Sequence, residues 1–274
     1  MTRAAVIQMT SGTEVGANLN AARILLMQAC EQGAQLAVLP ENFALMGRHE
    51  HDKLQVAEVQ TGNALGQGPM QQWLRATARE LGLWIVAGTL PIKTSEPQHV
   101  APACLVVDDR GELRARYDKI HLFDVDVADA HSRYRESNTM LPGTEPVLLE
   151  TPIGKLGLAI CYDIRFPELW RQLSARGAEV FVLPSAFTVP TGQAHWEVLL
   201  RARAIENLGY LLASAQAGMH QNGRETFGHS MIVDYWGNVL SCRPDTPGVV
   251  VADIDLQALH AQRKSFPALQ HRRL

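Results

Sequence analysis

Residues 155–170, KLGLAICYDIRFPELW, constrain the fold more than any other stretch of this chain. The apolar run at 156–160 is short and predicts a buried strand. Pro167 suits the first turn of a helix, because a missing N–H costs nothing there. The segment therefore predicts a strand, a turn that carries Cys161, and a helix. In open α/β sheets ligands bind at such strand ends, and a nearby helix N-terminus would favour the thiolate of Cys161.

Apolar periodicity predicts further strands and helices in alternation on both sides of this segment. Strands are expected at 4–9, 36–39, 83–89 and 210–215, and helices at 18–32, 70–81 and 196–205. Such alternation is typical of an α/β sheet.

Two short patterns each occur twice, in the same order. GAQLAVLPE at 33–41 returns as GAEVFVLPS at 177–185, and the V-D-x-x-G turn at 107–111 returns at 233–237. No linker or low-complexity segment divides the chain. We therefore predict a single domain over residues 1–274, with two similar α/β halves whose sheets pack together and whose helices lie outside. This is a four-layer α-β-β-α sandwich.

The segment at 104–122 has a different texture, because a strand, a turn with Gly111 and a returning strand predict an antiparallel hairpin. Side chains alternate along a strand, so Tyr117, Lys119 and His121 are expected on one face. Residues 124–142 are polar and lack periodicity, and they contain Glu136. A stretch of that length predicts a functional loop.

Composition excludes several classes of partner. The formal net charge is −3, and no block of Lys and Arg precedes the short tail at 271–273, which argues against nucleic acid and anionic membranes. The four cysteines lie far apart without a C-x-x-C, so a zinc ribbon has no support. No apolar run of about 18 residues occurs, and the N-terminal apolar run is too short for a signal peptide. We expect a cytoplasmic protein.

Three reactive groups follow predicted strands or lie on one: Glu41, Lys119 and Cys161. A thiol is nucleophilic as thiolate, so it needs a base or a positive neighbour, and a Glu and a Lys supply one each. Each group also has a structural interpretation. Cys161 alone would be an inert core residue, and Glu41 with Lys119 would form a solvated ion pair.

The sequence around these three residues resembles the nitrilase or carbon–nitrogen hydrolase superfamily over essentially the whole chain. The matching runs are LPEN around Glu41, YDKIHLFDV around Lys119 and AICYDIRFPE around Cys161. Glu136, in RESNTMLPG, falls where the superfamily keeps a second active-site carboxylate. The runs SAFTVPTGQAHWEVLLRARAIEN, GHSMIVDYWG and QHRR look most like the Nit branch, which includes the amidases of deaminated glutathione and the ω-amidases.

The resemblance implies a mechanism without a metal or an organic cofactor. Cys161 would attack an amide carbonyl, while Glu41 takes the thiol proton and passes it to the leaving amine. Lys119 and the backbone N–H of Tyr162 would hold the oxyanion. Glu136 would orient Lys119 or the substrate amide, and two close carboxylates would push one pKa upward.

The substrate expected from the resemblance is a small carboxylated amide: deaminated glutathione, or the shorter ω-amide of a 2-oxo acid. Arg165 lies where a guanidinium could bind a carboxylate bidentately, although an ion pair with Glu168 is an equal alternative. Phe187 and Thr191 would line the pocket, with plain loop packing as their alternative.

Three further expectations remain open at this level. A Cys–His pair is the competing thiol mechanism, and we interpret the available His121, His195 and His229 as structural. A non-catalytic binding protein on the same fold is the alternative to an enzyme. By resemblance we expect a homodimer or a higher homo-oligomer, with the helices at 166–176 and 196–207 as candidate two-fold surfaces.

Overall fold

The computed structural model describes residues 1–129 and 131–273 and contains two twisted sheets that pack face to face. The first sheet has the strand order β17-β1-β2-β3-β5-β4, with β6 paired to β5. Its strands are β1 (Thr2–Gln8), β2 (Leu36–Leu39), β3 (Trp84–Ala87), β4 (Leu90–Lys93), β5 (Val100–Val107), β6 (Leu113–Asp118) and β17 (Gly248–Ile254). Strand β17 pairs antiparallel with β1, so the C-terminal part of the chain completes the sheet that the N-terminal part begins.

The second sheet has the order β16-β15-β12-β11-β10-β9 and is built from the later part of the chain. Its strands are β9 (Leu148–Thr151), β10 (Gly154–Leu158), β11 (Val180–Ser185), β12 (Tyr210–Ala215), β15 (Ser230–Val233) and β16 (Val239–Arg243). At the centre of each sheet the strands are parallel, and β2, β11 and β12 are buried throughout, as expected where both faces are covered.

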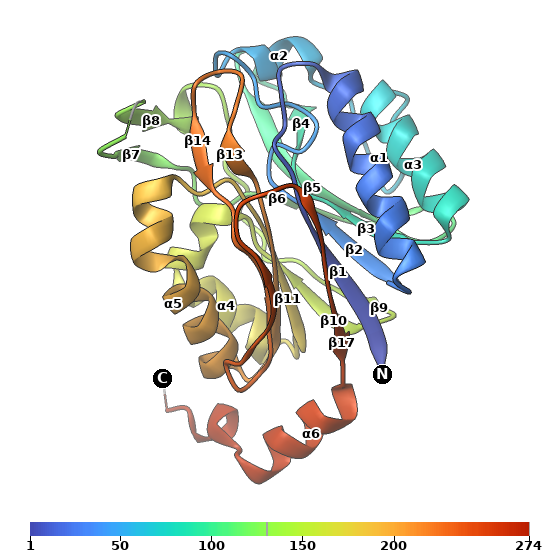
Figure 1. The fold of residues 1–274 in the computed structure, drawn as a ribbon, viewed down its shortest axis with the longest axis vertical. Helices are drawn as coiled ribbons and strands as arrows, with labels where there is room; N and C mark the ends of the chain where they lie inside the picture. The colour runs from blue at the N-terminus through green and yellow to red at the C-terminus, as the bar shows by residue number, and fades with distance from the viewer. Residues whose placement is uncertain (130, 274) are drawn as a thin grey trace.

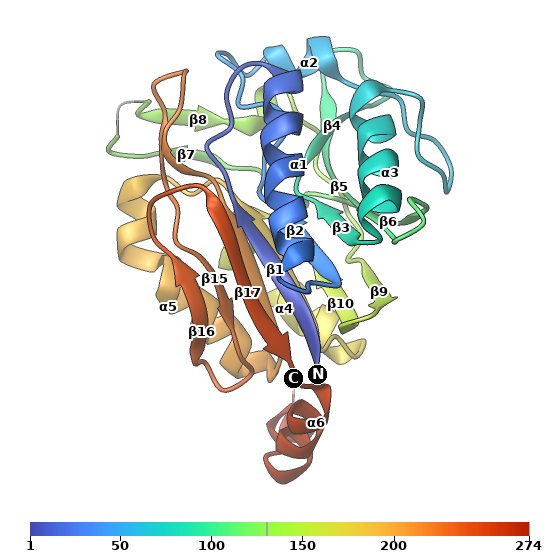
Figure 2. The same cartoon turned by 45° about the vertical axis from the view of Figure 1, so that its right-hand side comes forward.

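Helices cover the outer face of each sheet (Figures 1 and 2). α1 (Val15–Glu31) and α3 (Pro69–Leu81) lie on the first sheet, and α4 (Pro167–Ala175) and α5 (Val189–Asn207) lie on the second. The short α2 (Asp52–Val56) lies at one end of the sandwich, and α6 (Leu256–Ser265), followed by the 3-10 turn η3 (Ala268–His271), extends from the other. The predicted four-layer α-β-β-α sandwich is confirmed.

The repeated sequence patterns occupy equivalent places in the two halves. The paired runs form β2 and β11, each with a proline near its end. In the turn after β5, Asp108 accepts hydrogen bonds from the N–H groups of Arg110 and Glu112. In the turn after β15, Asp234 accepts them from Trp236 and Asn238 in the same way. The two halves are therefore similar even in the hydrogen bonds of this turn, as predicted.

Several predicted boundaries are wrong. The returning strand was expected through residue 122, but β6 ends at Asp118. Beyond it, Lys119 donates its N–H to the carbonyl of Pro102, and the carbonyl of Lys119 accepts the N–H of Gly143. Strand alternation therefore does not determine the directions of Lys119 and His121. The strand before Cys161 is β10, which ends at Leu158 and not at residue 160.

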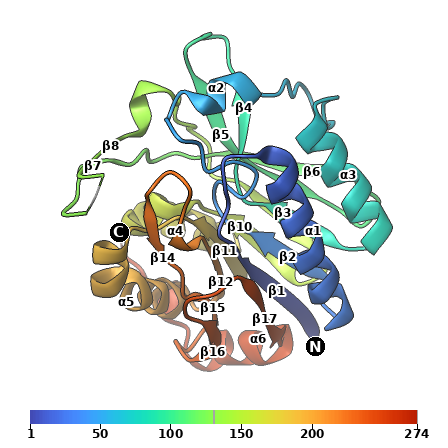
Figure 3. The same cartoon turned by 45° about the horizontal axis from the view of Figure 1, so that its top comes forward.

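The polar stretch 124–142 is also more regular than expected. It contains the two-stranded hairpin of β7 (Asp124–Asp126) and β8 (Arg133–Arg135) and the 3-10 turn η1 (Glu136–Asn138). Figure 3 shows this hairpin on the same side of the molecule as β14 (Glu225–Phe227), which pairs with β13 (Ala217–Met219). Within the described residues, no helix is both long enough and apolar enough to cross a membrane.

Candidate active site

Glu41 lies just beyond β2, where Pro40 ends the strand, and its carboxylate is buried. The Oε1 atom of Glu41 is 2.8 Å from the Nζ of Lys119. The backbone turns sharply here, and Gly88 makes room for it: a Cβ at Gly88 would lie 1.9 Å from the carbonyl oxygen of Pro40. The close approach of two strand ends therefore delivers Glu41 into the interior.

Lys119 is fully buried, and its ammonium lies between two carboxylates. Besides Glu41 it contacts both oxygens of Glu136, at 3.1 and 2.8 Å. Burial alone would lower the pKa of Lys119, but the charges of Glu136 and Glu41 outweigh it and hold the pKa well above its usual value. Glu136 also accepts the N–H of Phe123 at 2.8 Å. The three side chains form one buried ionic cluster.

The pKa of Glu136 differs from the expectation for paired carboxylates. Burial would raise it, but the charges of Lys119 and Lys53 and the hydrogen bonds to the carboxylate outweigh burial, and the net shift of the pKa is downward. The predicted upward push therefore does not apply to Glu136, because a lysine lies between it and Glu41. Glu136 is an ionised partner that fixes Lys119.

Cys161 begins the 3-10 turn η2 (Cys161–Arg165), which joins β10 to α4, so its predicted place between strand and helix is confirmed. Its φ of 45° lies in the left-handed region, which is strained for a residue with a side chain. Burial, and then the Glu41 carboxylate, raise the pKa of the thiol above its usual value, against the opposing effects of Lys119 and the N–H of Ala186. The prediction of a thiolate favoured by a helix N-terminus is wrong, because the thiol is buried beside a carboxylate.

Asp163 is a buried residue that the sequence analysis missed. It accepts hydrogen bonds from the backbone N–H of Ile160 at 2.8 Å, from the hydroxyl of Tyr117 at 2.7 Å and from the N–H of His121 at 3.1 Å. Its Oδ1 is also 2.7 Å from the Nδ1 of His121. Asp163 thereby ties the turn of Cys161 to the chain around Lys119. The available signal was an acidic residue two positions after Cys161 in a tight turn.

The three histidines considered as alternative bases have other partners. His121 contacts Asp163 and stacks on Phe166 at 3.7 Å between ring centroids. His195 lies 3.3 Å from a guanidinium nitrogen of Arg165, and the Nδ1 of His229 is 2.9 Å from the carbonyl oxygen of Phe227. None of the three lines the pocket that contains Cys161. The arrangement favours Glu41 as the base.

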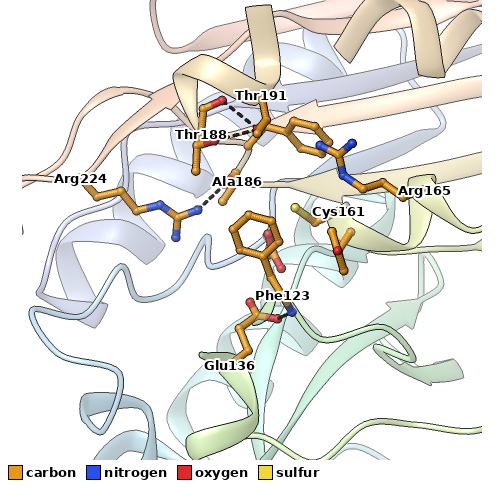
Figure 4. Close-up of a pocket in the computed structure, with 11 residues that line it drawn as sticks. Phe123, Glu136, Cys161, Arg165, Ala186, Thr188, Thr191 and Arg224 are labelled. Atoms are coloured by element: carbon orange, nitrogen blue, oxygen red, sulfur yellow. Dashed lines mark hydrogen bonds between the residues drawn. The ribbon is translucent and has the colours of Figure 1, made fainter. Parts of the chain in front are cut away.

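One pocket contains Cys161 together with all four predicted substrate-binding residues (Figure 4). The guanidinium of Arg165 lies over the rings of Phe187 and Tyr162, with 5.5 and 5.9 Å to the centroids. Arg165 and Glu168 are both described by the structure, and they form no ion pair with each other. The lining side chains are Glu41, Phe123, Glu136, Cys161, Tyr162, Arg165, Ala186, Phe187, Thr188, Thr191 and Arg224.

Four of these residues were not among the predicted site residues: Phe123, Ala186, Thr188 and Arg224. The first three lie within the family-like runs YDKIHLFDV and SAFTVPTGQAHWEVLLRARAIEN, and only Arg224 lies outside every such run. Thr188 shares a hydroxyl–hydroxyl contact of 2.7 Å with Thr191. Arg224 donates to the carbonyl of Ala186 and lies 5.2 Å from the centroid of the Tyr134 ring. It arrives from the turn between β13 and β14, far along the chain, which explains why local patterns do not reveal it.

An α-β-β-α sandwich with a cysteine and two carboxylates in one pocket, and a buried lysine bonded to both carboxylates, defines a class of hydrolases that use a thiol. Residues 3–264 match the model of the carbon-nitrogen hydrolase family, and the chain belongs to that family. It is 43% identical over 273 residues to a deaminated glutathione amidase from Yersinia enterocolitica. The match covers 98% of this chain and 92% of that protein. The predicted relation to the Nit branch is confirmed.

Solved structures agree with this assignment. The NitFhit protein of Caenorhabditis elegans superimposes with a TM-score of 0.90 at 38% identity, and the match covers 99% of this chain, which spans only 65% of that one. An amidase variant from Nesterenkonia sp. AN1 superimposes with a TM-score of 0.81 at 28% identity, covering 99% and 94% of the two chains. That structure is described as showing covalent addition of the acetamide moiety of fluoroacetamide at the active-site cysteine.

Proposed function

We propose that this carbon–nitrogen hydrolase, acting as a single domain over residues 1–274, cleaves deaminated glutathione to 2-oxoglutarate and cysteinylglycine. The observation that carries the proposal is one pocket that holds a buried thiol, a carboxylate beside it, and a guanidinium. Relatives of more than 40% identity with the same named activity support the choice of substrate. The alternative is an ω-amidase acting on amides of 2-oxo acids.

The first half of the reaction forms a thioester. The sulfur of Cys161 attacks the amide carbonyl carbon as Glu41 takes the thiol proton, and the carbonyl electrons move to oxygen. The raised pKa of Cys161 suits this order, because proton transfer accompanies the attack and no free thiolate accumulates. The tetrahedral intermediate then collapses: the C–N bond breaks, and Glu41 returns its proton to the leaving amine.

Lys119 and the backbone N–H of Tyr162 would stabilise the oxyanion. The ammonium has three protons, and its two contacts of 2.8 Å use one each for Glu41 and Glu136. The third contact, to Glu136 at 3.1 Å, is the longest. That proton can therefore turn to the oxyanion while Glu136 still holds the lysine in place.

The second half of the reaction releases the acid. A water molecule attacks the thioester carbonyl as Glu41 takes one of its protons, and the C–S bond breaks. The proton returns to the sulfur of Cys161, so thiol and carboxylate are restored. The residues invoked supply every proton transfer, and the net reaction is amide plus water giving acid plus amine.

The substrate side of the proposal places a carboxylate on Arg165. Its guanidinium is held over two rings and is not neutralised by Glu168, so its charge is available to an acidic ligand. Tyr162, Phe187 and Thr191 would then form the walls around the acyl chain. Both candidate substrates carry a 2-oxo carboxylate, so this contact is common to them.

The decisive experiment compares kcat/KM for deaminated glutathione and for 2-oxoglutaramate on the purified protein. We expect the larger value for deaminated glutathione. A preference of about tenfold for 2-oxoglutaramate, about 1.4 kcal/mol in transition-state binding, would contradict the proposed substrate but not the amidase mechanism. Cys161→Ala should abolish both activities, and Cys242→Ala, at an exposed thiol, is the matched control.

We also propose that the protein acts in the cytoplasm as a homo-oligomer. The two helices expected at the two-fold surface, α4 and α5, pack together, and α5 presents the exposed apolar side chains of Val198 and Ile205. Association would remove that apolar surface from water. Sedimentation at micromolar concentration tests this, since a monomer near 30 kDa would contradict it.

A further inference from the structure

A second hollow adjoins the pocket of Cys161, and the two share Phe123, Glu136 and Arg224 as lining residues. In Figure 4, Arg165, which lines only the first pocket, and Arg224, which lines both, lie on opposite sides of Phe123. The second hollow is also lined by Arg48, Lys53 and Arg133. We call the hollow with these three residues and Arg224 the basic pocket.

None of the four cationic side chains of the basic pocket forms an ion pair with a described residue. Of its two acidic lining residues, Glu136 is already held by Lys119, and Glu50 is exposed. The ammonium of Lys53 makes no hydrogen bond or ion pair with any described residue, and Nε of Arg224 is buried without a hydrogen-bond partner among them. Burial lowers the pKa of Lys53 against the opposing charges of Glu136 and Glu41, and the cations Lys119 and Arg224 lower it further. An anion bound here would meet donors that the protein leaves unused.

The direction of the reaction places the leaving group toward this pocket. The group that protonates the leaving nitrogen must lie on the leaving side of the carbonyl, and in the proposed mechanism that group is Glu41. Asn42, the next residue in the chain, lines the basic pocket, and so does Glu136. Arg165, to which the proposed function assigns the acyl end of the substrate, lies on the other side of Phe123 from Arg224 in Figure 4.

We propose that the basic pocket binds the C-terminal carboxylate of the peptide that leaves, and that Lys53 is a specificity-determining residue for substrates with such a leaving group. The inference rests on the proposed function, because deaminated glutathione releases a dipeptide with a carboxylate at its far end. A dipeptide spans at most about 7 Å when extended. That length suits a basic pocket that shares lining residues with the pocket of the thiol. An ω-amide releases ammonia and leaves the basic pocket empty of substrate.

The test compares Lys53→Met with the wild-type enzyme on the two substrates. Methionine keeps the length of the side chain and removes its charge, so kcat/KM for deaminated glutathione should fall about tenfold further than kcat/KM for 2-oxoglutaramate. Lys264→Met, at an exposed lysine on α6, is the matched control and should leave both values at the wild-type level. An equal fall on both substrates, or no fall, would overturn the inference.

A second arm removes the anion instead of the cation. Deaminated glutathione amidated at its C-terminal carboxylate should be about tenfold poorer than the free acid for the wild-type enzyme, and equal to it for Lys53→Met. Undiminished sensitivity to amidation in Lys53→Met would place the carboxylate elsewhere. If the wild type itself hydrolyses 2-oxoglutaramate but not deaminated glutathione, the proposed substrate fails. That failure appears in the wild type with the unmodified substrates, whereas failure of the basic-pocket inference appears with the amidated substrate or in Lys53→Met.

Discussion

Two buried polar regions meet at Glu41, and they are built in opposite ways. In front of its side chain lies the charged cluster of Glu41, Lys119 and Glu136, beside Cys161 and an open pocket. Behind its backbone lies a neutral network of Ser11, Gln216, His220 and Thr226. The first region consists of charged side chains beside the pocket of Cys161. The second consists of uncharged side chains that hydrogen-bond to one another and to the backbone.

The neutral network satisfies its polar atoms internally. Gln216 donates to the carbonyl of Glu41 at 3.0 Å and to the hydroxyl of Ser11 at 2.8 Å, and it accepts the N–H of Ser11 at 3.0 Å. Nδ1 of His220 donates to the carbonyl of Ser11, because a carbonyl can only accept, and Nε2 then accepts from the hydroxyl of Thr226. Every member holds backbone or another member in place.

The difference separates positioning from chemistry. A buried charge is costly unless it is paired, so the lysine between two carboxylates is retained where an oxyanion must be met. A neutral network has no charge to desolvate and is a cheaper way to hold a strand end. We therefore expect changes in the charged cluster to reduce turnover, and changes in the neutral network to reduce stability.

The largest effect should follow Glu41→Gln. The amide keeps the shape of the side chain but cannot take the thiol proton, so kcat should fall by about 10²–10⁴. The fold should persist, because Lys119 keeps Glu136 and the bond from Gln216 goes to the backbone of residue 41. Steady-state kinetics and thermal unfolding measure the two effects. Near-normal turnover would show that the base lies elsewhere.

A smaller effect should appear in the pH dependence of stability. Burial, and to a lesser extent Arg224, lower the pKa of His220 to about 4, against an unfolded value of about 6.5. In that window the unfolded chain binds more protons, so the free energy of unfolding falls as pH falls from 6.5 to 4, by about 3 kcal/mol in total. Urea unfolding at several pH values measures it.

The variant His220→Gln should flatten this pH dependence, while His51→Gln, at an exposed histidine, should not. The charged cluster responds in a different window. Because the pKa of Glu136 is lowered, its contribution to stability is full above about 4.3 and is lost only as pH falls through the lower folded pKa. An unchanged profile in His220→Gln would remove the neutral network from the acid response.

The smallest of the three effects should follow Arg165→Lys, because Arg165 lines the pocket through contacts with Tyr162 and Phe187 and is not part of the charged cluster. A bidentate fork becomes a point charge, which should cost about 1–3 kcal/mol in transition-state binding for both substrates. Values of kcat/KM on each substrate measure this. Arg110→Lys, at an exposed turn, serves as the control. An unchanged kcat/KM would leave Arg165 as a packing residue over Phe187 and Tyr162.

Local patterns in the sequence were enough for the architecture. The apolar runs and the repeated patterns predicted the central strands, the covering helices and the two halves, because period and proline placement are properties of neighbouring residues. They placed Glu41 and Cys161 at strand ends for the same reason. Boundaries such as the end of β6 at Asp118 were missed, because there a contact from Lys119 to Pro102 redirects the chain.

Within the site, the sequence by itself determined that an acid, a lysine and a thiol occur in family-specific contexts, but not how they affect one another. The direction of the pKa shift of Cys161 was decided by burial and by Glu41, which approaches only when the two sheets pack. Lys53, on α2, and Arg224, in the turn between β13 and β14, likewise reach the site from distant segments that carry no local pattern. Local patterns encode local structure, whereas proximity across the sandwich, and with it the charge around the thiol, is a product of packing.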